Sequence, residues 1–311
     1  MWNKRKPLAA LCIVGLLVGL LAPSPAAAQQ PSLRPADSCA AGAGARMAPF
    51  RAGDTVRILA VGNSFSEDAV EQYLYELAQA EGIELVVGNL YIGGCAIDRH
   101  LANARADAPA YEYRKIVEGR KTNRAGIRLS EALREEAWDF VSLQQASPAS
   151  GQYDTYNNTL PPLVDYVKHT LRHAACRIVF HQTWAYAQDA THPGFAHYHR
   201  NQSTMYAAIV DAVGKAVALS GIETVIPAGA AIQHGRATPI GDRLTRDGYH
   251  LNDVGRYIAA CTWLEALLGK NAVGNRWRPP TLTPEWAALA QEAAHAAVAR
   301  PDTPPPAEQT P

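Results

Sequence analysis

Residues 57–66 read RILAVGNSFS, and this stretch joins a strand, a turn and the start of a helix. Ile58 to Val61 form a short apolar run, which is typical of a strand buried on both faces. A turn follows at Gly62-Asn63-Ser64, and apolar residues then recur with helical spacing at Val70, Tyr73, Leu74 and Leu77. The pattern predicts a serine at the point where a buried strand turns into a helix.

The expected N-cap of this helix is Ser66, and Gly82 suits its C-terminal cap. Glu67 and Asp68 suit the positive first turn. A serine at such a turn lies beside backbone N–H groups that have no partner within the helix, and an enzyme that stabilises an oxyanion needs these groups. A serine at such a turn is more commonly structural than catalytic, so a catalytic role for Ser64 depends on motifs elsewhere in the chain.

Strand and helix patterns alternate along most of the chain, which predicts one α/β domain. Further strands are expected at 85–92, 140–143, 177–182 and 224–227, and further helices at 160–173, 200–219, 252–268 and 284–299. Residues 111–133 alternate in polarity and predict a β-hairpin inserted on the surface. The expected fold is a three-layer α/β/α sandwich, with a central, mostly parallel five-stranded sheet and a small inserted hairpin.

Parallel sheets of this kind carry their sites at the carboxyl ends of the strands. That rule selects Asn63-Ser64, Gly93-Gly94, Gln144-Gln145 and the segment His181 to Tyr186.

A second chemical signal is the stretch DGYHLN at residues 247–252, just before a predicted helix. Asp247 and His250 are three residues apart and can point into one cleft. A histidine there can take a proton from a serine hydroxyl, and an aspartate can orient the imidazole. An ordinary Asp-Gly turn with an exposed histidine is the alternative.

Taken together, these motifs resemble the SGNH (GDSL-like) hydrolase superfamily, from about Arg57 to Gly269. The stretches GNSFSEDA, NLYIGGC, LQQAS and DGYHLNDVGRY are similar to a bacterial branch known as a domain of unknown function, DUF4886. The resemblance implies a serine esterase with a triad of Ser64, Asp247 and His250. It also implies an oxyanion hole that includes the backbone N–H groups of Ser64 and Gly94.

One block departs from the superfamily pattern. After the third strand the superfamily usually has Gly-x-Asn-Asp, whose Asn side chain is an oxyanion donor, whereas this chain has Gln144 and Gln145. A glutamine amide donates the same kind of N–H. Strand alternation sends one of the two into the cleft and the other away. Gln144 is the favoured donor, with Gln145 as the alternative.

Several other residues are expected near the substrate: Asn63, Gly93, Trp184, Tyr186 and Tyr249. Trp184 and Tyr186 suit a sugar-stacking wall, although packing against the following helix explains them as well. His192, His197 and His199 lie together, but we interpret them as surface or lid residues rather than metal ligands. No metal and no cofactor are expected.

The N-terminus predicts export by a cleavable signal peptide over residues 1–28. Lys4, Arg5 and Lys6 precede an apolar stretch that is too short for a comfortable membrane span, and a small-residue cleavage site follows at Ala26 to Ala28. An irregular segment at 29–52, a hydrolase domain at 53–299 and a disordered tail at 300–311 complete the expected organisation. We expect a secreted or periplasmic protein without stable membrane insertion after cleavage.

The charge of the chain argues against one class of partner. The chain has 29 basic and 29 acidic side chains and no long basic run, so nucleic-acid binding has no electrostatic support.

Cys39, Cys95, Cys176 and Cys261 lack metal-binding spacing. They could form up to two disulfides, and a bridge from Cys95 near the site is one option. We expect Cys95 to be a structural residue rather than a nucleophile.

The leading hypothesis is an exported serine esterase that hydrolyses acyl or methyl esters, with a small-molecule or polysaccharide ester as substrate. Carbohydrate esters are expected from the resemblance and from export, not from individual residues. A lipid or short-chain carboxylesterase, a glycan acyltransferase and a non-catalytic carbohydrate-binding module are the alternatives.

Overall fold

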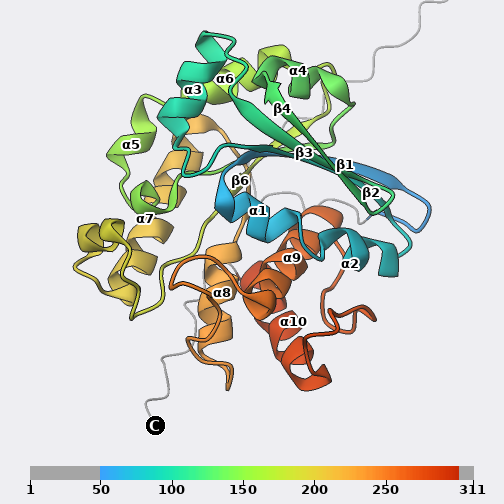
Figure 1. The fold of residues 1–311 in the computed structure, drawn as a ribbon, viewed down its shortest axis with the longest axis vertical. Helices are drawn as coiled ribbons and strands as arrows, with labels where there is room; N and C mark the ends of the chain where they lie inside the picture. Colours follow the sequence, from blue (N-terminus) through green and yellow to red (C-terminus); the bar gives the residue numbers. More distant parts are fainter. Residues whose placement is uncertain (1–49, 301–311) are drawn as a thin grey trace, which may run out of the picture. The chain divides into compact units, whose positions relative to one another are not determined.

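The computed structural model describes residues 50–300. The expected signal peptide, most of the expected irregular segment and the tail beyond Arg300 lie outside these residues. Within them, one sheet has seven strands in the order β4-β3-β2-β1-β5-β6-β7 (Figure 1). The strands are β1 (Thr55–Gly62), β2 (Glu84–Tyr91), β3 (Tyr111–Val117), β4 (Arg120–Ile127), β5 (Phe140–Leu143), β6 (Arg177–His181) and β7 (Thr224–Ile226).

The five strands β2, β1, β5, β6 and β7 are parallel, which confirms the expected mostly parallel sheet. β1 is the central strand of the site because it pairs with β2 on one side and with β5 on the other. Its residues from Ile58 to Gly62 are all buried. This follows from the apolar sequence, since only a strand covered on both faces can bury every side chain.

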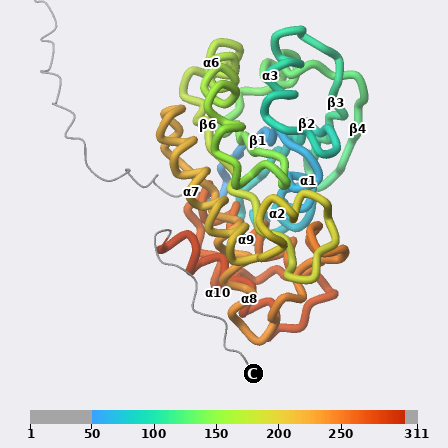
Figure 2. The backbone as a smooth tube through the Cα atoms, turned by 90° about the vertical axis from the view of Figure 1, so that its left-hand side faces the viewer, coloured from blue at the N-terminus to red at the C-terminus, as the bar shows by residue number. Residues whose placement is uncertain are grey.

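Helices cover both faces of the sheet, which confirms the three-layer arrangement (Figures 1 and 2). One layer contains α1 (Ser64–Val70), α2 (Leu74–Ala80), α8 (Ala228–Arg236), α9 (Asp253–Leu268) and α10 (Pro284–Ala299). The other layer contains α3 (Ile97–Arg105), α4 (Leu129–Glu135), α5 (Asp154–Asn157), α6 (Leu160–Thr170) and α7 (Gln202–Ser220). Two short 3₁₀ helices, η1 (Ser147–Ala149) and η2 (Pro193–Tyr198), contact each other.

The inserted hairpin is part of the sheet and not a separate surface feature. β3 pairs antiparallel with the free edge of β2, and β4 pairs antiparallel with β3. Tyr111 and Tyr113 are buried, so the hairpin has an apolar face that packs onto the domain. The charged strand β4 then forms the outer edge, where charges discourage pairing with other chains. The chain leaves the hairpin for α4 at Leu129, earlier than the expected end at residue 133.

The prediction of a single helix after the turn at Gly62-Asn63-Ser64 is wrong, because the structure has two helices there, α1 and α2. Tyr73 adopts a left-handed backbone conformation with φ of 69°, which interrupts the helical hydrogen bonds. Its hydroxyl donates to Asp253 Oδ1 at 2.9 Å. Val70, Leu74 and Leu77 are nevertheless buried as their spacing predicts, and both helices pack on α9. Among the helices of residues 50–300, none has the length and apolar character needed to cross a bilayer.

Candidate active site

The turn after β1 is capped by Asn63. The Asn63 side chain accepts a hydrogen bond from the Phe65 N–H at 3.0 Å, so Ser64 is the first residue of α1. The expectation that Ser66 is the N-cap is wrong, because Ser66 lies inside the first turn. Its buried hydroxyl oxygen lies 2.7 Å from the Asn63 carbonyl oxygen and 2.9 Å from Asn89 Oδ1, and these two acceptors share its single proton. Asn and Ser are both good N-caps, so the sequence offered two starting points for one helix.

Three side chains from the two motifs form one hydrogen-bonded series. Ser64 Oγ lies 2.9 Å from His250 Nε2, and His250 Nδ1 lies 2.6 Å from Asp247 Oδ2. Because a carboxylate only accepts hydrogen bonds, the His250 proton is on Nδ1 and Nε2 is free to accept from the serine hydroxyl. In this arrangement a histidine can take the proton of a serine hydroxyl, and a carboxylate can orient the histidine.

Asp247 is held by its own loop. Its Oδ1 accepts hydrogen bonds from the backbone N–H groups of Tyr249, at 3.1 Å, and His250, at 2.7 Å. Partial burial opposes ionisation, but the backbone and side-chain hydrogen bonds from His250 and the one from Tyr249 outweigh it. The pKa of Asp247 is consequently below its ordinary value. An ionised Asp247 favours the protonated imidazole that forms when His250 accepts a proton.

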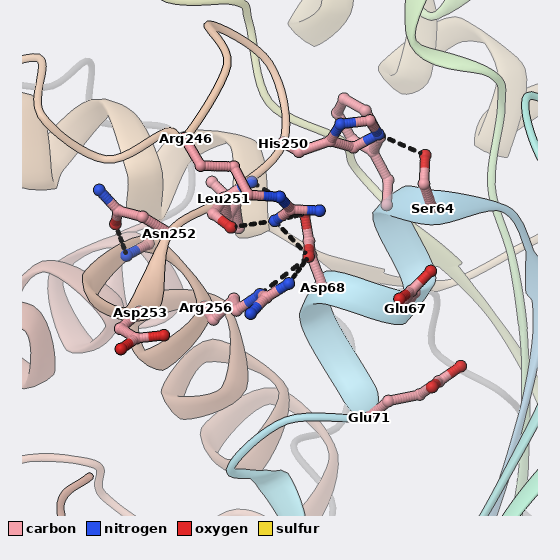
Figure 3. A network of polar contacts seen from close by, with 12 residues as sticks. Ser64, Glu67, Asp68, Glu71, Arg246, His250, Leu251, Asn252, Asp253 and Arg256 are labelled. Carbon is pink, nitrogen blue, oxygen red and sulfur yellow. Dashed lines mark hydrogen bonds and ion pairs between the residues drawn. The ribbon is translucent and has the colours of Figure 1, made fainter. Parts of the chain in front are cut away.

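A buried carboxylate ties the histidine loop to the serine helix (Figure 3). Asp68 lies on α1, four residues after Ser64, and is fully buried. It accepts from Arg246 Nη1 at 2.9 Å, from Arg256 Nε at 2.9 Å and from the Leu251 N–H at 2.8 Å. The Arg246 N–H in turn donates to the His250 carbonyl at 2.8 Å. Asp68 and its three partners, called here the Asp68 latch, fix the distance between Ser64 and His250.

A cavity of about 330 Å³ opens over Ser64. It is lined by Asn63, Ser64, Phe65, Tyr91, Gly93, Gly94, Ala146, Ser147, Pro148, His192, Tyr249 and His250. The lining mixes aromatic rings, hydroxyls and imidazoles; Phe65 comes from α1, Tyr91 from the end of β2 and Tyr249 from the loop before α9. Such a surface suits a polar ligand that also presents flat or apolar faces.

Backbone donors face this cavity beside Ser64. Gly94 has φ of +60°, and nothing lies within 4 Å of the position a Cβ would take there. The backbone N–H groups of Ser64 and Gly94 have no acceptor within residues 50–300. β1 and β2 are parallel neighbours, so Ser64 and Gly94, which follow their carboxyl ends, line the same cavity. Two such donors can stabilise negative charge that develops on a substrate oxygen.

Neither glutamine of the third block lines the cavity, so the expected role of Gln144 or Gln145 as a direct donor is not what the structure shows. Gln144 is buried, and its Nε2 donates to Asn63 Oδ1 at 2.9 Å. The Gln145 amide binds the N–H groups of Ile97 and Ala146 and the hydroxyl of Thr155. β5 ends at Leu143, so the in-and-out alternation of a strand no longer applies to these residues.

Trp184 and Tyr186 do not form a sugar-stacking wall, because both side chains are fully buried. Trp184 stacks on Phe65 with ring centroids 4.3 Å apart, and its Nε1 donates to the Tyr249 carbonyl at 2.8 Å. The Tyr186 hydroxyl bonds Ser147 Oγ at 2.8 Å. The alternative interpretation, that Trp184 and Tyr186 pack inside the protein, is therefore correct. Their side chains contact residues that line the cavity. Tyr249 does line the cavity, as do Asn63 and Gly93.

The sequence does not predict six of the cavity residues: Phe65, Tyr91, Ala146, Ser147, Pro148 and His192. Tyr91 is the last residue of β2, and the Arg114 guanidinium lies 3.8 Å from its ring centroid. His192 was interpreted only as a surface or lid residue, yet its ring lies 4.8 Å from the ring of Tyr249. Tyr91 had a usable signal, since it stands at the carboxyl end of a strand next to Gly93. His192 had none, because a loop of 3₁₀ turns sets its position.

The described residues offer no metal site and no activated thiol. No group of three or more His, Cys, Asp or Glu side chains suited to a metal occurs within residues 50–300. Cys95, Cys176 and Cys261 are free, so a bridge among them is excluded, whereas Cys39 lies outside the described residues. Burial raises the pKa of Cys95 to about 12, which argues against a nucleophilic role.

Comparison with known proteins gives the following similarities. The family model described as "Domain of unknown function (DUF4886)" matches residues 57–297. A crystal structure of a DUF4886 family protein from Bacteroides uniformis is 50% identical, with a TM-score of 0.79 over 82% of this chain and 98% of that chain. A putative SGNH hydrolase from Slackia heliotrinireducens is 24% identical, with a TM-score of 0.48 over 68% of this chain and 99% of that chain.

A catalytic mutant of an acetylxylan esterase from Geobacillus stearothermophilus is 16% identical, with a TM-score of 0.46 over 70% of this chain and 96% of that chain. No curated protein matches.

Proposed function

The chain belongs to the DUF4886 family, a domain of unknown function, and on the chemistry of its own residues we propose that it is an exported serine esterase acting on short acyl esters of carbohydrates. The observation that carries this proposal is the series Ser64–His250–Asp247, with contacts of 2.9 and 2.6 Å at the mouth of a cavity. Support for export comes from the N-terminal sequence alone.

In the proposed acylation step, Ser64 Oγ attacks the ester carbonyl carbon while His250 Nε2 takes the hydroxyl proton. The carbonyl oxygen becomes an oxyanion, which the N–H groups of Ser64 and Gly94 stabilise. The intermediate collapses as His250 returns its proton to the departing alcohol. A water molecule then repeats the sequence on the acyl-enzyme, which releases the carboxylic acid and restores the Ser64 hydroxyl.

The nature of the cavity favours a small acyl group on a hydroxyl-rich alcohol. Its volume of about 330 Å³ is near the lower end for ligand pockets, too small for a long acyl chain together with its alcohol. Tyr91 and Tyr249 line the cavity with aromatic rings, which suit the apolar faces of a sugar. Ser147 and His192 add polar groups within the same lining.

His192 has a defined hydrogen-bonding state. Its Nδ1 accepts from the Gly194 N–H at 3.0 Å, so the proton of the neutral ring is on Nε2. Burial, and secondly the nearby His250, lower the pKa of His192 and favour the neutral ring, although Asp247 acts in the opposite direction. His192 Nε2 is thus a donor available to a hydroxyl oxygen of the leaving group.

A substrate panel tests the proposal. Purified protein is assayed on nitrophenyl acetate, butyrate and octanoate, on acetylated xylan and pectin, and on methyl-esterified pectin, with Ser64→Ala as control. We expect acetate release from acetylated glycans and loss of all activity in Ser64→Ala. Rapid cleavage of octanoate with no release from glycans would redirect the proposal to lipid esters. If no ester is cleaved and a fluorophosphonate does not label Ser64, the fold serves binding alone.

A further inference from the structure

The oxyanion hole needs its side-chain donor identified, because neither third-block glutamine reaches the cavity. Asn63 is the amide residue that does line the cavity, together with Ser64 and Gly94. The residue is almost completely buried, at 1% exposed, and its amide contacts two backbone groups of the protein. The identity of each partner therefore determines which end of the amide faces which group.

Two backbone groups orient the Asn63 amide independently. The Phe65 N–H can only donate, so the atom it contacts at 3.0 Å must be the amide oxygen, Oδ1. The Cys95 carbonyl can only accept, so the atom it contacts at 3.0 Å must be the amide nitrogen, Nδ2. Both assignments agree, and neither depends on a side chain that could be turned around.

The same logic extends behind Asn63. Because Asn63 Oδ1 is an acceptor, the Gln144 atom 2.9 Å from it must be the donor Nε2. Gln144 Oε1 then faces His181 Nδ1 at 2.9 Å, so His181 carries its proton on Nδ1. His181 is fully buried, and burial lowers its pKa to about 3, in agreement with a neutral ring. His181 thus donates to Gln144, and Gln144 donates to Asn63. These three side chains are called here the amide relay.

Asn63 Nδ2 has two N–H bonds, and the Cys95 carbonyl uses one of them. The second has no acceptor within residues 50–300. We propose that this second N–H is the side-chain donor of the oxyanion hole, acting with the N–H groups of Ser64 and Gly94, and that Gln144 is a positioning residue that acts only through Asn63. This inference rests on the proposed esterase function, and it assigns the donor to the residue before the nucleophile instead of to the third block.

A double-mutant cycle tests the assignment. The rate of labelling of Ser64 by a fluorophosphonate is measured for the parent protein, Asn63→Ala, Gln144→Ala and the double variant. This probe places its phosphonyl oxygen where the substrate oxyanion forms, and it does not require the natural substrate to be known. We expect labelling about 10²–10³ times slower for Asn63→Ala, which is the usual effect of removing one such donor. The Gln144→Ala defect should be smaller, and the double variant should match Asn63→Ala alone.

The variant Asn63→Asp distinguishes a role of Asn63 as oxyanion donor from its role as helix cap. A carboxylate keeps an acceptor for the Phe65 N–H but has no N–H to donate to the oxyanion or to the Cys95 carbonyl. A capping role alone therefore predicts faster labelling for Asn63→Asp than for Asn63→Ala, whereas the donor assignment predicts slow labelling for both. Thermal unfolding of each variant checks the fold, and Asn63→Asp gives the same comparison if Asn63→Ala does not fold. Once a substrate is known, the loss should be in kcat with KM nearly unchanged.

The opposing outcomes are distinct. If folded Asn63→Ala and Asn63→Asp are labelled at the parent rate, the assignment is wrong while the esterase proposal stands. If the two losses multiply in the double variant, Gln144 is itself a donor. If the parent protein is not labelled and cleaves no ester, the esterase proposal fails first and takes the assignment with it.

Discussion

Removal of the carboxylate at the Asp68 latch should destabilise the protein and misplace His250. Asp68 is fully buried and binds Arg246, Arg256 and the Leu251 N–H. Removing one partner of a buried ion pair typically costs about 3–5 kcal/mol of unfolding free energy. The side chains of Arg246 and Arg256 are 40% and 20% exposed, so water can hydrate the charges left behind and the lower figure applies.

For Asp68→Ala we therefore expect a loss of about 3 kcal/mol, which in a domain of this size lowers Tm by roughly 6–12 °C. The rate of Ser64 labelling by a fluorophosphonate, measured well below the new Tm, should fall about 10- to 100-fold, because a displacement of about 1 Å between Ser64 and His250 is enough for such a loss. Asp68→Asn keeps an acceptor for Leu251 and should lie between the two proteins.

Asp211→Ala is a matched control, since Asp211 forms an exposed pair with Lys215 on α7. It should change stability by no more than about 0.5 kcal/mol and leave labelling unchanged. If Asp68→Ala lowers Tm as expected but is labelled at the parent rate, Asp68 is structural only. If its Tm also matches that of the parent protein, the latch does not stabilise the fold.

Three further predictions concern His181, His192 and Cys95. His181 is neutral in the folded protein but takes up a proton below about pH 6.5 when unfolded, so unfolding free energy should fall as pH drops from about 6.5 towards 3, by at most about 1.4 kcal/mol per unit from this residue. Urea unfolding of His181→Asn should show a shallower fall; an unchanged slope would contradict this. His192→Phe should lower kcat/KM about 5-fold on sugar acetates and leave nitrophenyl acetate unaffected, since only the former offers a hydroxyl to Nε2. Iodoacetamide should not inactivate the native enzyme, because Cys95 is buried with a raised pKa; inactivation that Cys95→Ser abolishes would refute this.

The parallel part of the fold was predictable because its signals are local. The Phe140 to Leu143 strand and the Pro284 to Ala299 helix have the bounds expected from apolar runs, caps and proline position. The break at Tyr73 was not predictable, because it depends on a contact with Asp253, 180 residues away. For the same reason the pairing of the hairpin with β2 was missed, since alternation identifies a hairpin but not the edge that receives it.

The site shows the same division. Ser64, Asp247 and His250 follow from two compact motifs, each of which fixes its side chains within a few residues. The third block was harder to interpret, because resemblance supplies a role for a position but not a direction for a side chain. Gln144 stands where a donor was expected, yet its amide bonds Asn63, which follows β1, and His181 of β6.

The residue types at positions 63, 144 and 181 therefore depend on one another. A carboxylate at position 63 would face the Cys95 carbonyl, which accepts hydrogen bonds and cannot donate one. A glutamine at 144 spans the space between Asn63 and His181, whereas an asparagine, one methylene shorter, could not bond both. A histidine at 181 supplies the Nδ1 proton that directs the glutamine. The asparagine at 63 and the glutamine at 144 are thus two parts of one arrangement, and the proposed donor at Asn63 takes the role that the resemblance assigns to the third block.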